Sequence, residues 1–223
     1  MAAYYRPQTS PREAALQPAS AAICFIDVQV FNCCSTGAMQ RDLPPAEQAG
    51  EARRHFMQRV EECKPLWASL QQACRSAGVE VLYTVIQSLT MDGRDRGRDY
   101  KLSGFHVPPG SRDAQVLDCI PPGPDEIVLP KTSSSVFLST PLHYLLQNLG
   151  VRQLVLCGCV TDQCVEHAVR DACDLGYLVT LATDACATHS IQRQQASLAA
   201  VVGYCRQRTA DQLVQELAEA HPA

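Results

Sequence analysis

Apolar runs alternate with helical patterns of apolar residues along most of the chain. Short, nearly continuous apolar runs are typical of strands buried on both faces of a sheet, and apolar residues spaced three and four apart are typical of amphipathic helices. The predicted strands are residues 21–30 (AAICFIDVQV), 79–86, 126–129, 154–157, 177–182 and a short 204–208. The predicted helices are residues 47–77, 141–149, 161–175, 190–202 and a last helix after the capping-box sequence Thr209-x-x-Gln212.

This alternation predicts an α/β fold of three α/β/α layers, with a doubly wound, six-stranded, mostly parallel sheet of Rossmann-like type. Cap and breaker residues set the expected boundaries. Pro65 predicts a kink or restart in the 47–77 helix. Ser139 is the expected N-cap before Pro141, and Thr161 is the expected N-cap of the helix that ends before Gly176.

The chain is expected to form a single domain over residues 21–223, because 223 residues suffice for one sizeable α/β core. Residues 1–20 contain prolines and early charges without an apolar stretch, which predicts a flexible lead-in rather than a secretory signal. Residues 87–125 show no sustained periodicity and are rich in glycine and proline. A segment of this length predicts a lid or substrate loop.

Composition narrows the classes of partner. A net charge of −4 without a basic stripe argues against nucleic acid, and no apolar run is long enough to span a membrane. Twelve cysteines without a secretion signal or a C-x-x-C pair favour free thiols in a reducing cytoplasm over disulfides or structural zinc. The glycine patterns of dinucleotide and P-loop sites are missing, so no cofactor is expected.

Cys164 is the first candidate for chemistry. It follows a buried strand and falls in the first turn of the next helix, where the helix dipole and free backbone N–H groups favour a thiolate. Cysteine is also among the most commonly buried residues, so position alone is compatible with a packing role.

Two further polar residues are predicted at the same sheet edge as Cys164. Asp27 interrupts the first apolar run near its carboxyl end, and Lys131 follows the third strand. Ligands of open α/β sheets bind at the carboxyl ends of the strands. A carboxylate, an ammonium and a thiol converging there predict covalent catalysis, in which Lys131 lowers the thiol pKa and Asp27 moves the proton.

The chain resembles the isochorismatase-like cysteine hydrolase superfamily. The matching motifs are Asp27-Val28-Gln29, Lys131 with the downstream Ser135 and Phe137, and the sequence GCVTDQCV at 158–165. The resemblance covers about residues 21–217. It implies a catalytic triad of Asp27, Lys131 and Cys164, a cis peptide between Cys159 and Val160, and an oxyanion hole formed by the Val160 and Cys164 amides.

The resemblance further implies a metal-independent amidohydrolase. The enzyme would cleave a C–N bond of a small amide, carbamoyl or ureido compound through a thioester, releasing ammonia or carbamate. Family members that cleave isochorismate lack the nucleophilic cysteine, which is present here as Cys164. Nicotinamidases have a metal-binding histidine after the second strand, and residues 85–89 contain no histidine. The pattern is most similar to ureidoacrylate- and N-carbamoyl-type enzymes. The family also implies a homo-oligomer, a dimer or tetramer.

Substrate contacts are the least determined part of the sequence interpretation. Gln29, Gln87, Arg94 and Phe137 are candidates, each with an alternative in solvent or in the core. Asp184 and His189, past the fifth predicted strand, are weaker candidates. Three other functions stay open: a catalytically silent member of the fold, another family hydrolase of the nicotinamidase or isochorismatase type, and a redox sensor in which Cys159 or Cys33 resolves an oxidised Cys164.

Overall fold

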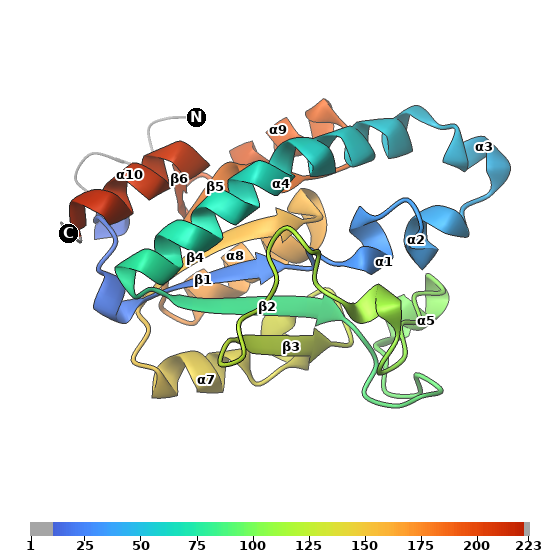
Figure 1. Ribbon diagram of the computed structural model, residues 1–223, viewed down its shortest axis with the longest axis horizontal. Coiled ribbons are helices and arrows are strands. Elements are labelled where there is room, and N and C mark those ends of the chain that lie inside the picture. Colours follow the sequence, from blue (N-terminus) through green and yellow to red (C-terminus); the bar gives the residue numbers. More distant parts are fainter. Residues whose placement is uncertain (1–10, 221–223) are drawn as a thin grey trace.

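A six-stranded parallel sheet organises the computed structural model, which describes residues 11–220 (Figure 1). The strand order is β3-β2-β1-β4-β5-β6, and every neighbouring pair is parallel. The strands are β1 (Ala21–Ile26), β2 (Glu80–Ile86), β3 (Ile127–Lys131), β4 (Gln153–Cys159), β5 (Leu178–Ala187) and β6 (Arg206–Arg208). The predicted fold class is confirmed, and the sheet is parallel throughout.

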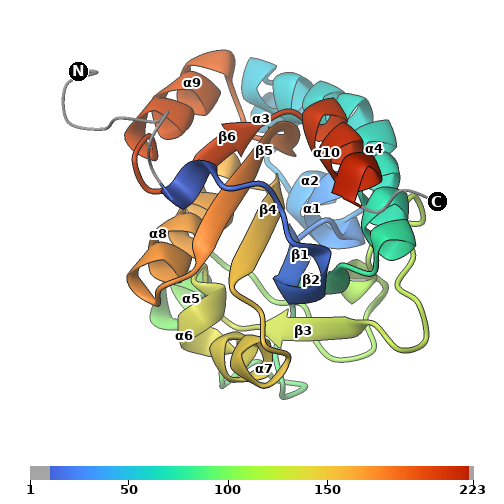
Figure 2. The ribbon, with the colours of Figure 1, turned by 90° about the vertical axis from the view of Figure 1, so that its left-hand side faces the viewer.

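Helices cover both faces of the sheet (Figure 2). They are α1 (Val30–Cys33), α2 (Ala38–Arg41), α3 (Pro45–Gln48), α4 (Glu51–Ala77), α5 (Arg98–Leu102), α6 (Val136–Ser139), α7 (Leu142–Asn148), α8 (Glu166–Asp174), α9 (Ile191–Ala200) and α10 (Ala210–Ala220). α4 and α10 pack together on one face, and α8 lies against β4 and β5 on the other. No helix within residues 11–220 is long and apolar enough to cross a membrane.

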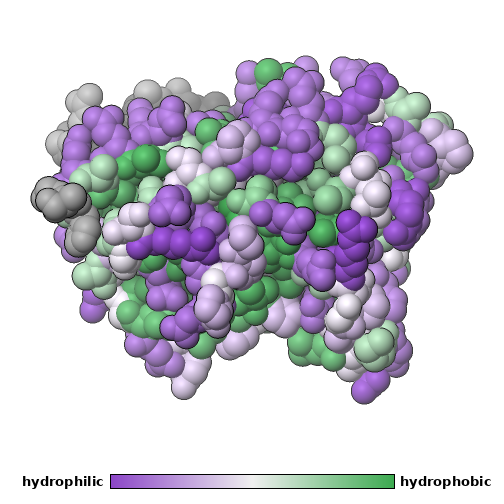
Figure 3. Space-filling model, in the orientation of Figure 1, coloured by the Kyte–Doolittle hydropathy of each residue, from purple (hydrophilic) through white to green (hydrophobic). Residues whose placement is uncertain are grey.

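The long helix α4 is anchored by one apolar stripe. Phe56, Val60, Trp67 and Leu70 are fully buried, and each such side chain contributes roughly 1.5–3 kcal/mol by leaving water. The Trp67 indole N–H also donates to the Ala185 carbonyl at 2.8 Å. Hydrophilic side chains cover much of the upper part of this face of the molecule, where α4 lies (Figure 3).

Pro65 does not restart the helix, because α4 is continuous from Glu51 to Ala77. Pro65 and Glu61, whose carbonyl would accept the missing N–H, are both exposed. Water can therefore take the place of that hydrogen bond.

The carboxyl ends of three strands meet where the sequence predicted. Ile26 of β1 pairs with Thr84 of β2 and Gly158 of β4, and Ile86 pairs with Lys131 at the end of β3. Gly158 has φ 120°, and a Cβ there would lie 2.2 Å from the Ile26 carbonyl oxygen. Only glycine allows β4 to run this close to β1.

Several predicted boundaries were wrong. The first strand ends at Ile26 rather than at residue 30, because Asp27 adopts a φ of 52° and turns the chain into α1. The chain between this strand and the long helix contains the short helices α1, α2 and α3, and the long helix begins at Glu51 rather than at residue 47. The fifth strand continues to Ala187, so Asp184 lies inside β5 and not past its end.

Two predicted helix caps do not form as expected. Ser139 ends the short helix α6, and the Thr140 hydroxyl accepts from the Leu142 N–H of α7 instead. Thr161 is not an N-cap; it begins a π-helical turn (Thr161–Val165) that leads into α8, and its hydroxyl donates to Gln194. The capping box at Thr209 and Gln212 is confirmed by two reciprocal hydrogen bonds, at 3.0 and 3.3 Å.

The second half of the predicted lead-in is packed against the domain rather than flexible. Leu16 is buried, its N–H donates to Glu216 at 2.6 Å, and Glu13 forms an ion pair with Arg208. The first half of the lead-in, residues 1–10, lies outside the described residues. The long segment after β2 contains only α5 and one 3-10 turn (Arg112–Ala114) before β3, as its lack of periodicity predicted.

Candidate active site

Asp27, Lys131 and Cys164 are brought together at the carboxyl edge of the sheet. The Lys131 ammonium nitrogen lies 2.8 Å from Asp27 Oδ2 and 3.3 Å from Cys164 Sγ. Asp27 and Lys131 are completely buried, and Cys164 is 5% exposed. The three side chains come from the ends of β1 and β3 and from the turn after β4.

The Lys131 ammonium is surrounded by four groups. Its three N–H groups donate to the Tyr100 hydroxyl at 2.8 Å, the Ser133 carbonyl at 3.0 Å and Cys164 Sγ. Asp27 Oδ2 is the ion-pair partner of the same nitrogen at 2.8 Å, so four acceptors share three N–H groups. Burial lowers the pKa of Lys131, but the nearby Asp27, Cys164 and Tyr100 raise it well above its usual value. Lys131 is therefore a cation at neutral pH.

The carboxylate of Asp27 is fixed by β2. The Thr84 hydroxyl donates to Oδ1 at 2.7 Å, and the Asp27 backbone N–H donates to the Thr84 carbonyl at 3.1 Å. The left-handed backbone of Asp27 is uncommon for a residue other than glycine, and such conformations concentrate at functional sites. Oδ2 is left as the oxygen that can exchange a proton.

The Cys164 thiol is not a resting thiolate. Burial raises its pKa, and the Asp27 charge raises it further, while Lys131 lowers it. Lys131 lowers the thiol pKa, as predicted, but the net shift is upward. Desolvation outweighs the Lys131 charge in a site this deeply buried. A base must take the proton when substrate binds, and the Asp27 carboxylate, ion-paired with Lys131, is the adjacent group.

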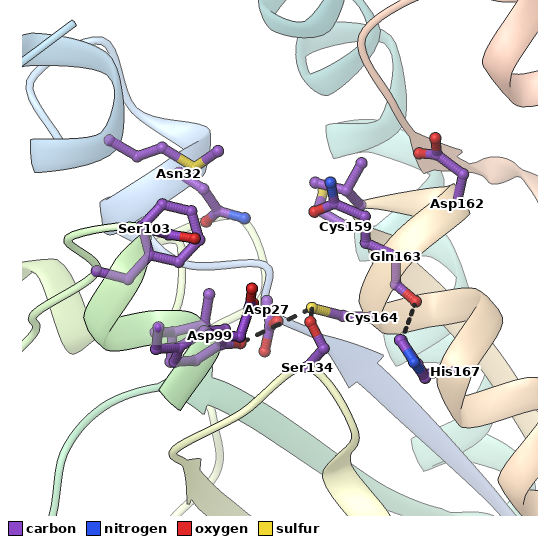
Figure 4. Close-up of a pocket in the computed structure, with 15 residues that line it drawn as sticks. Asp27, Asn32, Asp99, Ser103, Ser134, Cys159, Asp162, Gln163, Cys164 and His167 are labelled. Carbon is purple, nitrogen blue, oxygen red and sulfur yellow. Dashed lines mark hydrogen bonds between the residues drawn. The ribbon is translucent and has the colours of Figure 1, made fainter. Parts of the chain in front are cut away.

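A pocket of about 310 Å³ opens over Cys164, and Asp27, Val160 and Cys164 contribute to its lining (Figure 4). The peptide bond between Cys159 and Val160 is cis. Two walls face each other. The sheet-edge wall includes Asp27, Ser134, Val160, Gln163 and Cys164, and the loop wall consists of Asn32, Met39, Asp99, Tyr100, Ser103 and Phe105.

The four substrate-contact candidates do not line this pocket. Gln29 is buried and joins the Ile86 backbone to the Asp113 carbonyl. Gln87 directly follows β2, and its backbone N–H donates to the Lys131 carbonyl. Arg94 is exposed and paired with Asp92, and Phe137 stacks on Tyr177 at 6.2 Å. Gln29 and Phe137 therefore have packing or hydrogen-bonding positions within the domain, and Arg94 lies at the surface.

The weaker candidates also lie elsewhere. Asp184 accepts a hydrogen bond from the Ala210 N–H at the start of α10, and His189 stacks on Phe56 at 4.9 Å. Cys33 and Cys159 contact each other at 3.6 Å between sulfur atoms, and all the cysteines are free. The described polar contacts of Cys164 Sγ are with Lys131, Tyr100 and Ser134, and none is with a cysteine.

Tyr100 is the residue that the sequence interpretation missed. It belongs to α5 inside the long segment after β2, is 2% exposed, and places its hydroxyl between Lys131 at 2.8 Å and Cys164 Sγ at 4.0 Å. Burial raises the pKa of Tyr100, so the phenol stays neutral. One signal was available: Tyr100 is the sole aromatic residue between Gln87 and Gly104.

Asp162 secures the turn that carries Cys164. Its carboxylate accepts from the Thr188 hydroxyl at 2.6 Å and from Arg193 Nε at 2.5 Å. Burial alone would raise the pKa of Asp162, but Arg193 and Thr188 lower it below its usual value. Within residues 11–220, no group of three or more His, Cys, Asp or Glu side chains is arranged to hold a metal ion.

The fold and site have known relatives. Residues 21–213 match the family model of the isochorismatase domain. The chain therefore belongs to the isochorismatase family, and it is an isochorismatase-family hydrolase.

Solved structures agree in fold. A cysteine hydrolase from Pseudomonas syringae pv. phaseolicola is 24% identical, with a TM-score of 0.75 over 93% of this chain and 97% of that one. An isochorismatase family protein from Desulfovibrio vulgaris is 25% identical (TM-score 0.70; 89% and 98% covered). N-carbamoylsarcosine amidase from Thermoplasma acidophilum is 23% identical (TM-score 0.67; 86% and 97% covered).

Proposed function

We propose that this chain is a metal-independent cysteine hydrolase that cleaves the C–N bond of a small amide, carbamoyl or ureido compound. The observation that carries the proposal is the contact of Cys164 Sγ with Lys131 at 3.3 Å, beside the Asp27 carboxylate and at the base of a pocket. Two structural relatives, named a cysteine hydrolase and an N-carbamoylsarcosine amidase, support the same class.

The first half-reaction forms a thioester. Asp27 Oδ2 takes the thiol proton as Cys164 Sγ attacks the substrate carbonyl carbon. The carbonyl oxygen becomes an oxyanion, which the backbone N–H groups of Val160 and Cys164 stabilise by hydrogen bonds. Loss of one such donor typically costs about 3–4 kcal/mol of barrier. Collapse of the tetrahedral intermediate breaks the C–N bond, and Asp27 returns the proton to the departing nitrogen.

The second half-reaction restores the enzyme. Asp27 takes a proton from a water molecule, the resulting hydroxide attacks the thioester carbonyl, the C–S bond breaks, and Asp27 returns the proton to Cys164 Sγ. Lys131 keeps the site electropositive in both steps, and its hydrogen bond to Tyr100 fixes the position of the ammonium group. The products are ammonia or an amine with a carboxylic acid, or with carbamate when the substrate is a ureido compound.

Ammonia release from a panel of small amides tests the proposal. The panel contains ureidoacrylate, N-carbamoyl amino acids, biuret, succinamide and nicotinamide, each with and without a chelator. We expect the wild type to release ammonia at a rate that a chelator does not reduce. The rate should fall by at least about a thousandfold in Cys164→Ala. Cys173→Ala is the matched control, because Cys173 lies on α8 away from the pocket.

An acid quench during turnover provides a second readout. The acyl-enzyme should appear as a mass increase on the peptide that contains Cys164. Full activity of Cys164→Ala, or an acyl group on another residue, would refute the nucleophile assignment.

A further inference from the structure

The hydroxyl proton of Tyr100 has one acceptor within the protein. The phenol oxygen accepts a hydrogen bond from the Lys131 ammonium at 2.8 Å. An ammonium can only donate, so this contact uses a lone pair of the oxygen and leaves the phenol proton to be donated elsewhere. Among residues 11–220, the other polar atom within hydrogen-bond reach of this hydroxyl is Cys164 Sγ, at 4.0 Å. The sulfur is therefore the acceptor that the protein offers to the phenol proton.

The direction of this contact is determined once Cys164 loses its proton. While Cys164 is a thiol, either the sulfur or the phenol oxygen can donate. A thiolate has no proton and can only accept, and burial raises the pKa of Tyr100, so the phenol remains a neutral donor. Hydrogen bonds to charged atoms are shorter than those between neutral groups, and catalytic hydrogen bonds are often long before substrate binds. The contact should therefore shorten when the thiolate forms.

A small apolar cluster holds the Tyr100 ring. This cluster is separate from the main core and consists of Phe31, Ile86, Tyr100 and Val107, with Phe105 packed against it. The Tyr100 and Phe105 ring centroids are 5.4 Å apart. Since α5 has only five residues, its position depends on this packing rather than on its own stability. A phenylalanine at position 100 would keep the ring contacts and lose only the O–H group.

Few other donors can serve the thiolate. The three N–H groups of Lys131 are shared among four acceptors. Ser134 lies 3.9 Å from the sulfur, but it is partly exposed, and its hydroxyl can turn to solvent. Tyr100 is 2% exposed and its oxygen is fixed by Lys131. In Figure 4 the Cys164 sulfur points across the pocket toward α5, which carries Asp99 and Tyr100.

We propose that Tyr100 is a further catalytic residue, whose O–H group donates a hydrogen bond to the Cys164 thiolate when the nucleophile forms and again when the C–S bond of the thioester breaks. Lys131 supplies the charge, and Tyr100 supplies a neutral donor that keeps its proton throughout. Asp27 remains the group that transfers protons. The proposal rests on the proposed function only for the second step, because the first concerns the thiol alone. The segment after β2 thus completes the catalytic centre.

Alkylation of Cys164 by iodoacetamide tests the hydrogen bond without turnover. Peptide mass spectrometry gives the rate between pH 6 and 10. In Tyr100→Phe we expect the rate curve to move to higher pH by about one to two pH units, because a hydrogen bond to a charged group is lost. The rate near neutral pH should fall only about three- to tenfold, because a more basic thiolate is also more nucleophilic.

The other titratable groups near Cys164 are the same in both proteins. Asp27 of β1 and Lys131 of β3 lie beside the thiol, and Asp99, Asp162 and His167 line the rest of the pocket. None of them is changed by the substitution.

Tyr83→Phe is the matched control. Tyr83 is a buried tyrosine that does not line the pocket, and its hydroxyl accepts from Gln71 at 2.6 Å and donates to Glu126 at 2.8 Å. This variant should leave the alkylation curve unchanged. An unchanged curve in Tyr100→Phe, or an equal shift in Tyr83→Phe, would overturn the proposal.

3-Fluorotyrosine at position 100 separates donation to the sulfur from a role that acts only through Lys131. The fluorinated phenol is a stronger donor and a weaker acceptor than tyrosine. We expect its alkylation curve to move to lower pH than that of the wild type. If Tyr100 only held Lys131 in place, the weaker acceptor would leave the curve unchanged or move it to higher pH, and either result would refute the catalytic role.

Ammonia release from the amide panel provides the corresponding test in turnover. We expect kcat/KM to fall by about ten- to hundredfold in Tyr100→Phe and to stay unchanged in Tyr83→Phe. Wild-type hydrolysis together with an unchanged alkylation curve in Tyr100→Phe would refute the role of Tyr100 and leave the hydrolase standing. A shifted curve in a protein that hydrolyses no amide of the panel would support the hydrogen bond and count against the proposed function.

Discussion

The two walls of the pocket differ in how their polar side chains are paired. On the sheet-edge wall, Asp27 is held by Thr84 and by the charge of Lys131, and Lys131 uses every N–H it has. On the loop wall, Asn32 Oδ1 and the Asp99 carboxylate have no partner among the described residues. The polar groups of the first wall are fixed by contacts within the protein, whereas two polar groups of the second wall are not.

Substitutions on the sheet-edge side of the pocket, where the polar groups are paired, should have the larger effect on stability and turnover. We expect Lys131→Met to abolish turnover and to lower the free energy of unfolding by about 3–5 kcal/mol, because the Asp27 carboxylate is then buried without its counter-charge. Chemical denaturation measures the stability, and ammonia release measures the turnover.

The double variant Asp27→Asn/Lys131→Met is the control for this prediction. It removes both charges, and the amide can still accept from Thr84, so we expect most of the stability to return without activity. If the single and double variants are equally unstable, the buried pair does not hold this wall together.

The same contrast explains what the sequence could predict. Strands ending at one edge of a parallel sheet follow from the period and order of the apolar runs, so the convergence of Asp27, Lys131 and Cys164 could be predicted from the sequence. Tyr100 and Asn32 lie on short helices inside irregular segments. Their positions depend on tertiary packing, which cannot be inferred from segments whose apolar residues show no periodicity.

A related cause explains why the substrate-contact candidates do not line the pocket. Gln29, Gln87 and Arg94 are close in sequence to strand ends, but proximity in sequence does not fix the direction of a side chain. The Gln29 amide turns into the backbone of β2, where it satisfies groups that the end of the sheet would leave unpaired. Likewise, the upward pKa shift of Cys164 depends on its burial, which the motif did not reveal.

Asp27→Asn should separate thiol acidity from turnover. The Asp27 charge raises the pKa of Cys164 and Lys131 lowers it, so removing the carboxylate should bring the thiol pKa down. We expect Cys164 alkylation by iodoacetamide to become faster near neutral pH, with its midpoint at a lower pH. Turnover should fall by about 10²–10⁴ because the proton carrier is lost.

Rate against pH between 6 and 10 measures this effect, with Asp113→Asn as a control for a carboxylate outside the pocket. Slower alkylation in Asp27→Asn would mean that Asp27 promotes the thiolate at rest, contrary to the pKa direction given above.

Substitution of Asp162 should have the smallest effect on stability. Asp162→Asn removes an ion pair whose Arg193 side chain is 41% exposed, so solvent screening limits the expected loss in unfolding free energy to about 1 kcal/mol at neutral pH. The pKa of Asp162 is lowered in the folded state. Its contribution is therefore present above the usual aspartate pKa of about 4 and is lost as pH falls toward the lower folded value.

Denaturation of the wild type and Asp162→Asn at pH 7 and at pH 3 measures this loss, and the difference between the two proteins should shrink at the lower pH. Asp42→Asn, in an ion pair with more than half of both side chains exposed, should show no measurable difference at either pH. A difference for Asp162→Asn that stays constant with pH would show that packing of the turn, rather than the charge, holds Cys164 in place.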